Sequence, residues 1–187
     1  MSETKTDVLL LMLMGIVILL MVAIIGLFLR MNQLQREVLA ALEPFQTMSR
    51  PEGLEIGTQA PDFALADTED QTISLAGLAG QKVLLVFSSI HCPACAEMYP
   101  HLRAFSERTD GVQMVMISQD SAEENRQLVE EQGFGFPVLT WDDAVAQDYQ
   151  VPGTPFFYVI DRDGVIVNAD FANTLEQVEA LVEGGGK

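Results

Sequence analysis

An uncharged apolar run near the N-terminus most restricts how this chain can fold. Residues 8–29 are 22 residues without Asp, Glu, Lys or Arg, and the run ends at Arg30. As a helix the run is roughly 33 Å long, enough to cross a hydrocarbon layer of about 30 Å. A cleaved signal peptide usually has a shorter apolar region, about 7 to 15 residues, that ends at small residues. We therefore expect an uncleaved transmembrane anchor over residues 1–30, with residues 8–29 in the membrane.

The segment that follows the anchor is expected to be a juxtamembrane helix and linker over residues 31–53. Leu34, Val38 and Leu42 recur every four residues among polar ones, and Pro44 ends the pattern. The apolar stripe can pack on lipid heads or on the chain's own domain, or it can form a short coiled coil.

Positive charges orient the anchor only weakly. Lys5 precedes it and three arginines follow, which taken alone mildly favours a cytoplasmic domain.

Charge is concentrated in the C-terminal part of the chain. Residues 1–50 contain four Lys/Arg and four Asp/Glu, so the whole net charge of −17 lies in residues 51–187. Such an acidic surface repels nucleic acid and anionic lipid heads. Nucleic-acid binding is therefore excluded as a function class, whereas a soluble acidic face and a docking face for a basic partner both stay open.

Alternating strands and helices predict an α/β fold for residues 54–187. Three continuous apolar runs, at residues 83–87, 112–118 and 156–160, are typical of strands buried on both faces. Helical segments at 93–108 and 121–132 lie between them, which predicts parallel strands in a three-layer domain. A turn at 161–164 predicts an antiparallel hairpin with residues 165–167, and a last helix is expected at 174–182.

Cys92 and Cys95 are the only cysteines, so neither has another partner for a structural disulfide. They stand where a buried strand changes to a helix, with Pro93 in the first helical turn, where its missing N–H costs nothing. A helix N-terminus stabilises a thiolate. We therefore expect Cys92 to attack disulfides and Cys95, one turn further along, to resolve the mixed disulfide.

Metal and cofactor chemistry is not expected at this pair. A tetrahedral zinc site needs two ligands besides the cysteines. The chain has no second Cys pair, and its two histidines, His91 and His101, both lie close to the cysteines in sequence, with none further along the chain. His91 can lie beside Cys92 and favour its thiolate, or it can be a plain loop residue. His101 is expected on the helix surface. Trp141 is expected to be partly buried, with a place on a docking face as the alternative.

The motifs together resemble a known family. Residues 60–63 (Ala-Pro-Asp-Phe), the Cys-Pro-Ala-Cys turn, Pro100 and residues 153–155 (Gly-Thr-Pro) are similar to membrane-anchored TlpA-type redoxins of the thioredoxin fold, over about residues 54–183. The segment 87–95 with an N-terminal anchor looks most like the methylamine-utilisation accessory redoxins of the MauD type. That family is implicated in disulfide formation in a cysteine-rich periplasmic subunit.

The resemblance carries expectations about place, partners and site. It implies a single-pass protein of the cytoplasmic membrane whose domain faces the periplasm or cell exterior and acts on Cys-containing protein substrates. It implies a cis Pro155, and a substrate-binding surface formed by His91, Pro93, Ala94, Thr154 and Pro155. Two departures matter: Val86 stands where thioredoxins usually carry a buried acid, and Ser88 where they carry an aromatic residue. Cys95 thus lacks its usual proton-transfer helper, and the direction of electron flow stays open.

Other classes fit the sequence less well. A peroxiredoxin also carries Ala-Pro-Asp-Phe, but its Pro-x-x-x-Thr-x-x-Cys context is absent around Cys92. A Sco-type copper chaperone would need Cys-x-x-x-Cys and a distant His, and this sequence has neither. A non-catalytic accessory subunit of a larger membrane complex remains the main alternative to an oxidoreductase.

Overall fold

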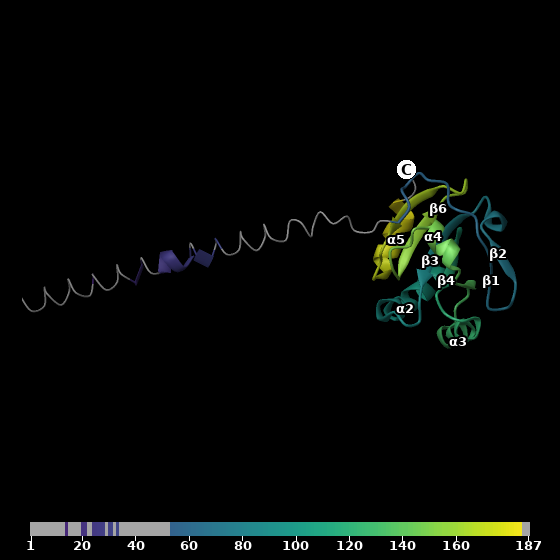
Figure 1. The fold of residues 1–187 in the computed structure, drawn as a ribbon, viewed down its shortest axis with the longest axis horizontal. Coiled ribbons are helices and arrows are strands. Elements are labelled where there is room, and N and C mark those ends of the chain that lie inside the picture. Colours follow the sequence, from purple (N-terminus) through teal and green to yellow (C-terminus); the bar gives the residue numbers. More distant parts are fainter. Residues whose placement is uncertain are drawn as a thin grey trace, which may run out of the picture. The chain divides into compact units, whose positions relative to one another are not determined.

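The computed structural model describes residues 53–184 and part of the N-terminal segment (Figure 1). In that segment it describes Met14, Leu20, Met21, residues 24–28, Arg30, Met31 and Gln33, all helical with exposed side chains. The chain divides into two compact units, residues 1–50 and 51–187, and each is described by itself. Among the described residues no helix is long and apolar enough to cross a membrane. The expected anchor at 8–29 and the helix and linker at 31–53 fall largely outside the described residues.

A five-stranded mixed sheet forms the centre of the second unit, in the order β5-β4-β3-β6-β7. Its strands are β3 (Lys82–Ser88), β4 (Val112–Ser118), β5 (Val138–Thr140), β6 (Phe156–Ile160) and β7 (Ile166–Asp170). β3, β4 and β5 run parallel, whereas β6 runs antiparallel to both of its neighbours. The parallel register pairs Ser88 with Ser118, so the carboxyl ends of β3 and β4 lie side by side.

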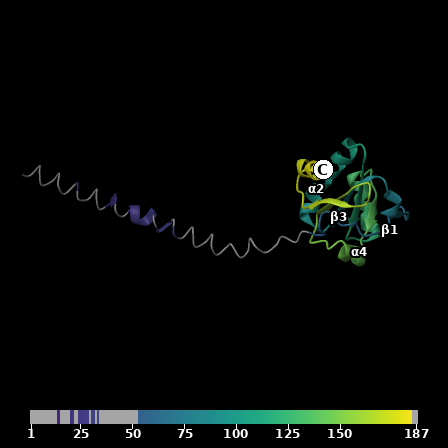
Figure 2. The ribbon, with the colours of Figure 1, turned by 90° about the horizontal axis from the view of Figure 1, so that it is seen from above.

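Helices and a small hairpin cover the two faces of this sheet (Figures 1 and 2). The helices are α2 (Pro93–Arg108), α3 (Ala122–Gln132), α4 (Asp143–Asp148) and α5 (Leu175–Gly184), and the short 3-10 helix η1 spans Ala76–Leu78. One core joins Leu84 and Val86 of β3 to buried residues of α2, α3 and α5. The other joins Val83, Leu85 and Phe87 to the segment before β3 and to Tyr149 at the end of α4. The result is a three-layer α/β domain with β3 at its centre.

Most of the sequence-based elements are confirmed. β4, β6 and α2 have the predicted bounds, and β3 is one residue longer at each end. Ser121 caps α3 through a capping box with Glu124, as predicted. The antiparallel hairpin of β6 and β7 is also confirmed, although β7 begins at Ile166 and extends to Asp170.

Five short elements were not predicted. They are β1 (Ala64–Ala66) and β2 (Thr72–Ser74), which pair with each other, together with η1, β5 and α4. Strands of three residues are too short to show an alternating apolar and polar pattern, and α4, with only six residues, is too short to show a helical one. Tertiary pairing and the Asp142 cap, whose carboxylate accepts from two backbone N–H groups, stabilise β5 and α4 instead.

Candidate active site

Cys92 is presented by a turn between the central strand and the first long helix of the domain. β3 ends at Ser88, residues 89–91 form the turn, and Cys92 is the N-cap of α2 in an extended conformation. Pro93 occupies the first helical turn as predicted. The Cys92 carbonyl accepts the N–H groups of Cys95 and Ala96, at 3.0 and 3.1 Å. The nucleophile therefore stands at the positive end of a 16-residue helix.

The Cys92 sulfur is surrounded by hydrogen-bonding groups while it stays partly accessible. Its thiol donates to the Thr154 carbonyl oxygen at 3.3 Å, and the Cys95 N–H donates to the sulfur at 3.3 Å. Burial alone would raise the pKa of Cys92. Hydrogen bonds from the Cys95 and Thr154 side chains and from the backbone of Cys95 and Ala94 outweigh burial and lower this pKa below its ordinary value. At Cys92 the hydrogen bonds around the helix N-terminus thus outweigh burial.

Cys95 has the opposite environment. Its side chain is 0% exposed and belongs to the core between α2 and the sheet. Burial, together with the hydrogen bond to Cys92, raises the pKa of the Cys95 thiol above its ordinary value. Both cysteines are free thiols in this structure. One accessible thiol with a lowered pKa therefore stands beside one buried thiol with a raised pKa, as expected for an attacking and a resolving cysteine.

The loop before β6 closes the other side of the site. The Thr154–Pro155 peptide bond is cis, as the resemblance implied; Pro155 is buried and Thr154 is half buried. The hydrogen bond from Cys92 to the Thr154 carbonyl brings this loop against the helix N-terminus. Thr154 and Pro155 thus lie beside Cys92, with Pro93 and Ala94 in the adjoining turn of α2. That these four residues bind substrate stays a prediction.

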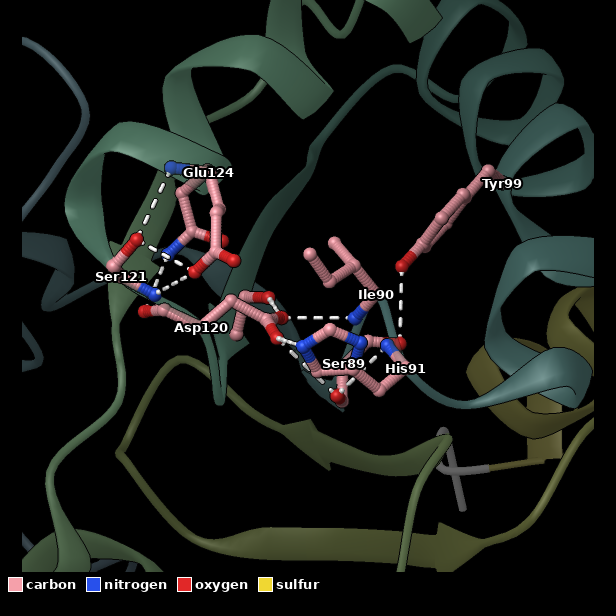
Figure 3. Close-up of polar contacts among 9 residues, drawn as sticks. Ser89, Ile90, His91, Tyr99, Asp120, Ser121 and Glu124 are labelled. Carbon is pink, nitrogen blue, oxygen red and sulfur yellow. Dashed lines mark hydrogen bonds and ion pairs between the residues drawn. The ribbon is translucent and has the colours of Figure 1, made fainter.

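His91 directly precedes the nucleophile in the chain, and its side chain pairs with Asp120. Its side chain is 77% exposed, and its Nε2 lies 3.8 Å from a carboxylate oxygen of Asp120 (Figure 3). The groups that lower the pKa of Cys92 most do not include His91. The structure therefore places His91 as an exposed partner of Asp120, and its predicted contact with substrate stays a prediction.

Asp120 is the residue of this region that the sequence did not indicate. Its side chain is 0% exposed and lies beneath the turn that leads to Cys92 (Figure 3). Its carboxylate accepts hydrogen bonds from the Ile90 N–H at 2.8 Å, the Ser118 hydroxyl at 2.7 Å and the Ser89 hydroxyl at 3.4 Å. A buried carboxylate thus fixes the backbone of residues 89–91 directly before the nucleophile.

Trp141 and His101 are the two remaining residues that the sequence singled out. Trp141 is half buried, stacks edge-on against Phe87 at 5.7 Å, and lines an open depression of about 570 Å³ beside Asp120. Its packing role is therefore confirmed. His101 lies within α2 and is half buried. Among the described residues, no three His, Cys, Asp or Glu side chains gather as metal ligands would.

Comparison with known proteins assigns this domain to a family. Residues 56–169 match the AhpC/TSA family. This chain belongs to the AhpC/TSA family. The chain is 30% identical over 171 residues to the methylamine utilization protein MauD of Paracoccus denitrificans, an alignment that covers 89% of this chain and 85% of MauD.

Two further relatives carry the name of an activity. The thiol-disulfide oxidoreductase ResA of Bacillus thuringiensis is 28% identical over 137 residues, which cover 71% of this chain and 79% of ResA. The thioredoxin domain of a thiol-disulfide oxidoreductase from Bacteroides vulgatus superposes with a TM-score of 0.60 at 25% identity, covering 69% of this chain and 99% of that domain. The thioredoxin-like fold, the MauD resemblance and the class of enzyme, a thiol-disulfide oxidoreductase, are thereby confirmed.

Proposed function

We propose that this protein is a membrane-anchored thiol-disulfide oxidoreductase that exchanges disulfides with Cys-containing polypeptides outside the cytoplasm. The observation that carries the proposal is the pairing of an accessible Cys92, whose pKa is lowered, with a buried Cys95, whose pKa is raised. An extended substrate fits beside Thr154, whose carbonyl oxygen contacts the Cys92 thiol. No metal or cofactor is required, because the two cysteines alone can exchange electron pairs.

The cycle follows from the two thiols. The Cys92 thiolate attacks one sulfur of a substrate disulfide, forms a mixed disulfide and releases the other substrate sulfur as a thiolate. Cys95 then attacks Cys92, releases the substrate and leaves a Cys92–Cys95 disulfide. The same steps in reverse oxidise a substrate dithiol. The direction depends on the redox potential of the pair and on its electron partner.

The redox potential of the full-length chain tests the proposal. After equilibration in glutathione buffers, alkylation should reveal a reversible Cys92–Cys95 disulfide with a midpoint between about −270 and −120 mV. A value near the lower end would identify a reductant that needs a membrane electron donor, and one near the upper end an oxidant. If no reversible disulfide forms, exchange is ruled out and the accessory-subunit alternative takes its place. A reaction with hydrogen peroxide that outpaces all disulfides would favour a peroxidase.

The anchor and its orientation form a separate part of the proposal. Support comes from the uncharged run at 8–29 and from the large apolar side chains of its described residues, which are more than half exposed in Met14, Leu20, Met21, Ile24, Ile25, Leu27 and Phe28. Exposed apolar side chains in such a row need a lipid or protein partner. Placing the domain outside the cytoplasm rests on the likeness to MauD.

Fractionation and topology reporters test this part. The chain should stay in the membrane pellet after alkaline carbonate treatment, and a C-terminal alkaline phosphatase fusion should be active in the periplasm. A matched fusion to a protein that fluoresces only in the cytoplasm should stay dark. Release by carbonate would refute the anchor, whereas an inactive phosphatase with a fluorescent counterpart would reverse the orientation.

A further inference from the structure

The face of β3 that looks toward Cys95 carries two polar side chains: Lys82 at the start of the strand, whose ammonium donates to the Val182 carbonyl oxygen, and Ser88 at its end. Side chains alternate along a strand, and Leu84 and Val86 belong to the same core as Cys95. Ser88 follows Val86 by two residues, so its hydroxyl lies on this same face. The step along the strand moves about 7 Å toward the turn that presents Cys92. Because Leu84 and Val86 are apolar, Ser88 is the only residue of the three that can hydrogen-bond a sulfur.

The Ser88 hydroxyl is buried without a hydrogen-bond partner of good geometry. Ser88 is 1% exposed, and its Oγ makes no hydrogen bond within the described residues. Nearby hydroxyls do have partners: that of Ser118, which pairs with Ser88 in the sheet, donates to Asp120, and that of Tyr99 in α2 donates to the Ser89 carbonyl at 3.2 Å (Figure 3). Burying a hydroxyl without a hydrogen-bond partner lowers the stability of the fold. The presence of such a hydroxyl here therefore points to a partner formed in another state of the protein.

The surroundings identify that partner. Burial raises the pKa of Tyr99 to about 12, and the Ser88 side chain acts against this rise. Burial also raises the pKa of Cys95, and the Ser88 side chain is among the groups that act against that rise as well. Ser88 therefore lies within reach of both groups, and of these two only the Cys95 sulfur gains negative charge during disulfide exchange.

We propose that the Ser88 hydroxyl is a catalytic hydrogen-bond donor that stabilises Cys95 as a thiolate in the resolving step. The inference rests on the exchange cycle proposed above and assigns the helper of its second half. In that step the Cys95 thiol passes its proton to water, its sulfur bonds to Cys92, and the bond between Cys92 and the substrate breaks. The substrate leaves as a thiolate and takes up a proton from water. Ser88 donates throughout and is neither oxidised nor deprotonated.

Substitution of Ser88 by alanine separates this role from a structural one. Because the hydroxyl has no partner in the free dithiol protein, Ser88→Ala should leave the free energy of unfolding unchanged or raise it slightly. The resolving step should nevertheless slow about tenfold at neutral pH, which corresponds to about 1.4 kcal/mol, because the charged sulfur loses a hydrogen-bond donor. Ser88→Thr keeps the hydroxyl and should restore most of the rate.

The measurement uses the reduced full-length chain in detergent and an aromatic disulfide that releases a coloured thiol. Attack by Cys92 releases the first coloured thiol, and resolution by Cys95 releases the second, so the two rates are read separately. Ser88→Ala should leave the first rate unchanged and slow only the second. The deficit should shrink as pH rises, because Cys95 then ionises without help. Ser106→Ala removes a hydroxyl that donates to the Arg103 carbonyl in the last turn of α2, and it serves as the matched control.

Two outcomes would overturn the inference. One is a second phase that keeps the wild-type rate in Ser88→Ala across the pH range. The other is a second phase slowed equally at every pH, which would indicate a displaced Cys95 and a structural role. Failure of the exchange function itself is distinct, because the wild-type chain would then release no second coloured thiol and form no Cys92–Cys95 disulfide.

Discussion

Replacement of Cys92 by serine should abolish disulfide exchange, lowering the rate by roughly three orders of magnitude or more, as the loss of a covalent nucleophile does. The reason is that Cys92 is the partly accessible thiol with a lowered pKa, whereas Cys95 is 0% exposed. The measurement is reduction of a model protein disulfide, and the reverse oxidation, by the full-length chain. The variant should fold as the wild type does, because a serine oxygen can still accept the Cys95 N–H as an N-cap.

Replacement of Cys95 by serine is the matched control and has a different expected result. Attack by Cys92 continues in this variant but resolution fails, so mixed disulfides with substrate proteins should accumulate on non-reducing gels. The Cys92→Ser chain should trap none. If Cys95→Ser exchanged disulfides at the wild-type rate, or if Cys92→Ser trapped substrates, the assignment of attack and resolution to these two cysteines would be wrong.

The sequence predicted those parts of the fold in which a local pattern and the tertiary structure agree. β4 and β6 are continuous apolar runs because each is buried on both faces, so their bounds could be read from the sequence. Pro93 and the Ser121 capping box likewise mark helix starts locally. β5 follows Pro137 and has three residues, and pairing with β4 determines its conformation rather than any pattern of its own.

The candidate site was predicted in part for the same reason. Cys92 and Cys95 are recognisable because their spacing matches one helical turn. Asp120 is 28 residues after Cys92 and comes close only because β3 and β4 are parallel and in register, Ser88 beside Ser118. A usable signal was nevertheless present. Polar residues that follow two neighbouring parallel strands meet at the carboxyl edge of the sheet, which places Asp120 beneath the turn at 89–91.

Ser88 shows a second limit of sequence-based inference. Its departure from the usual pattern was visible, as was the replacement of a buried acid by Val86. The alternation along β3 assigns both residues to the face of Cys95, but only the structure shows that the Ser88 hydroxyl is buried without a partner. The absence of an acid at Val86 therefore does not leave this face of β3 without a polar group.

Replacement of Asp120 by alanine should destabilise the domain and slow the first step of exchange. The side chain is 0% exposed and accepts hydrogen bonds from Ile90, Ser118 and Ser89, so its loss leaves these buried donors unpaired. We expect the free energy of unfolding to fall by about 3 kcal/mol. The Ile90 N–H loses its acceptor two residues before Cys92. The turn should then hold the nucleophile less firmly, and attack by Cys92 should slow about tenfold.

Urea unfolding and the first phase of coloured-thiol release measure the two effects. Asp110→Ala removes an exposed acid from the turn between α2 and β4, and both quantities should stay near their wild-type values in this control. His91→Ala should also change stability little, because the imidazole is 77% exposed and lies 3.8 Å from the carboxylate. If Asp120→Ala unfolded at the wild-type urea concentration, the carboxylate would not be fixing the turn. If it lost stability but attacked at the wild-type rate, Asp120 would support the domain without positioning Cys92.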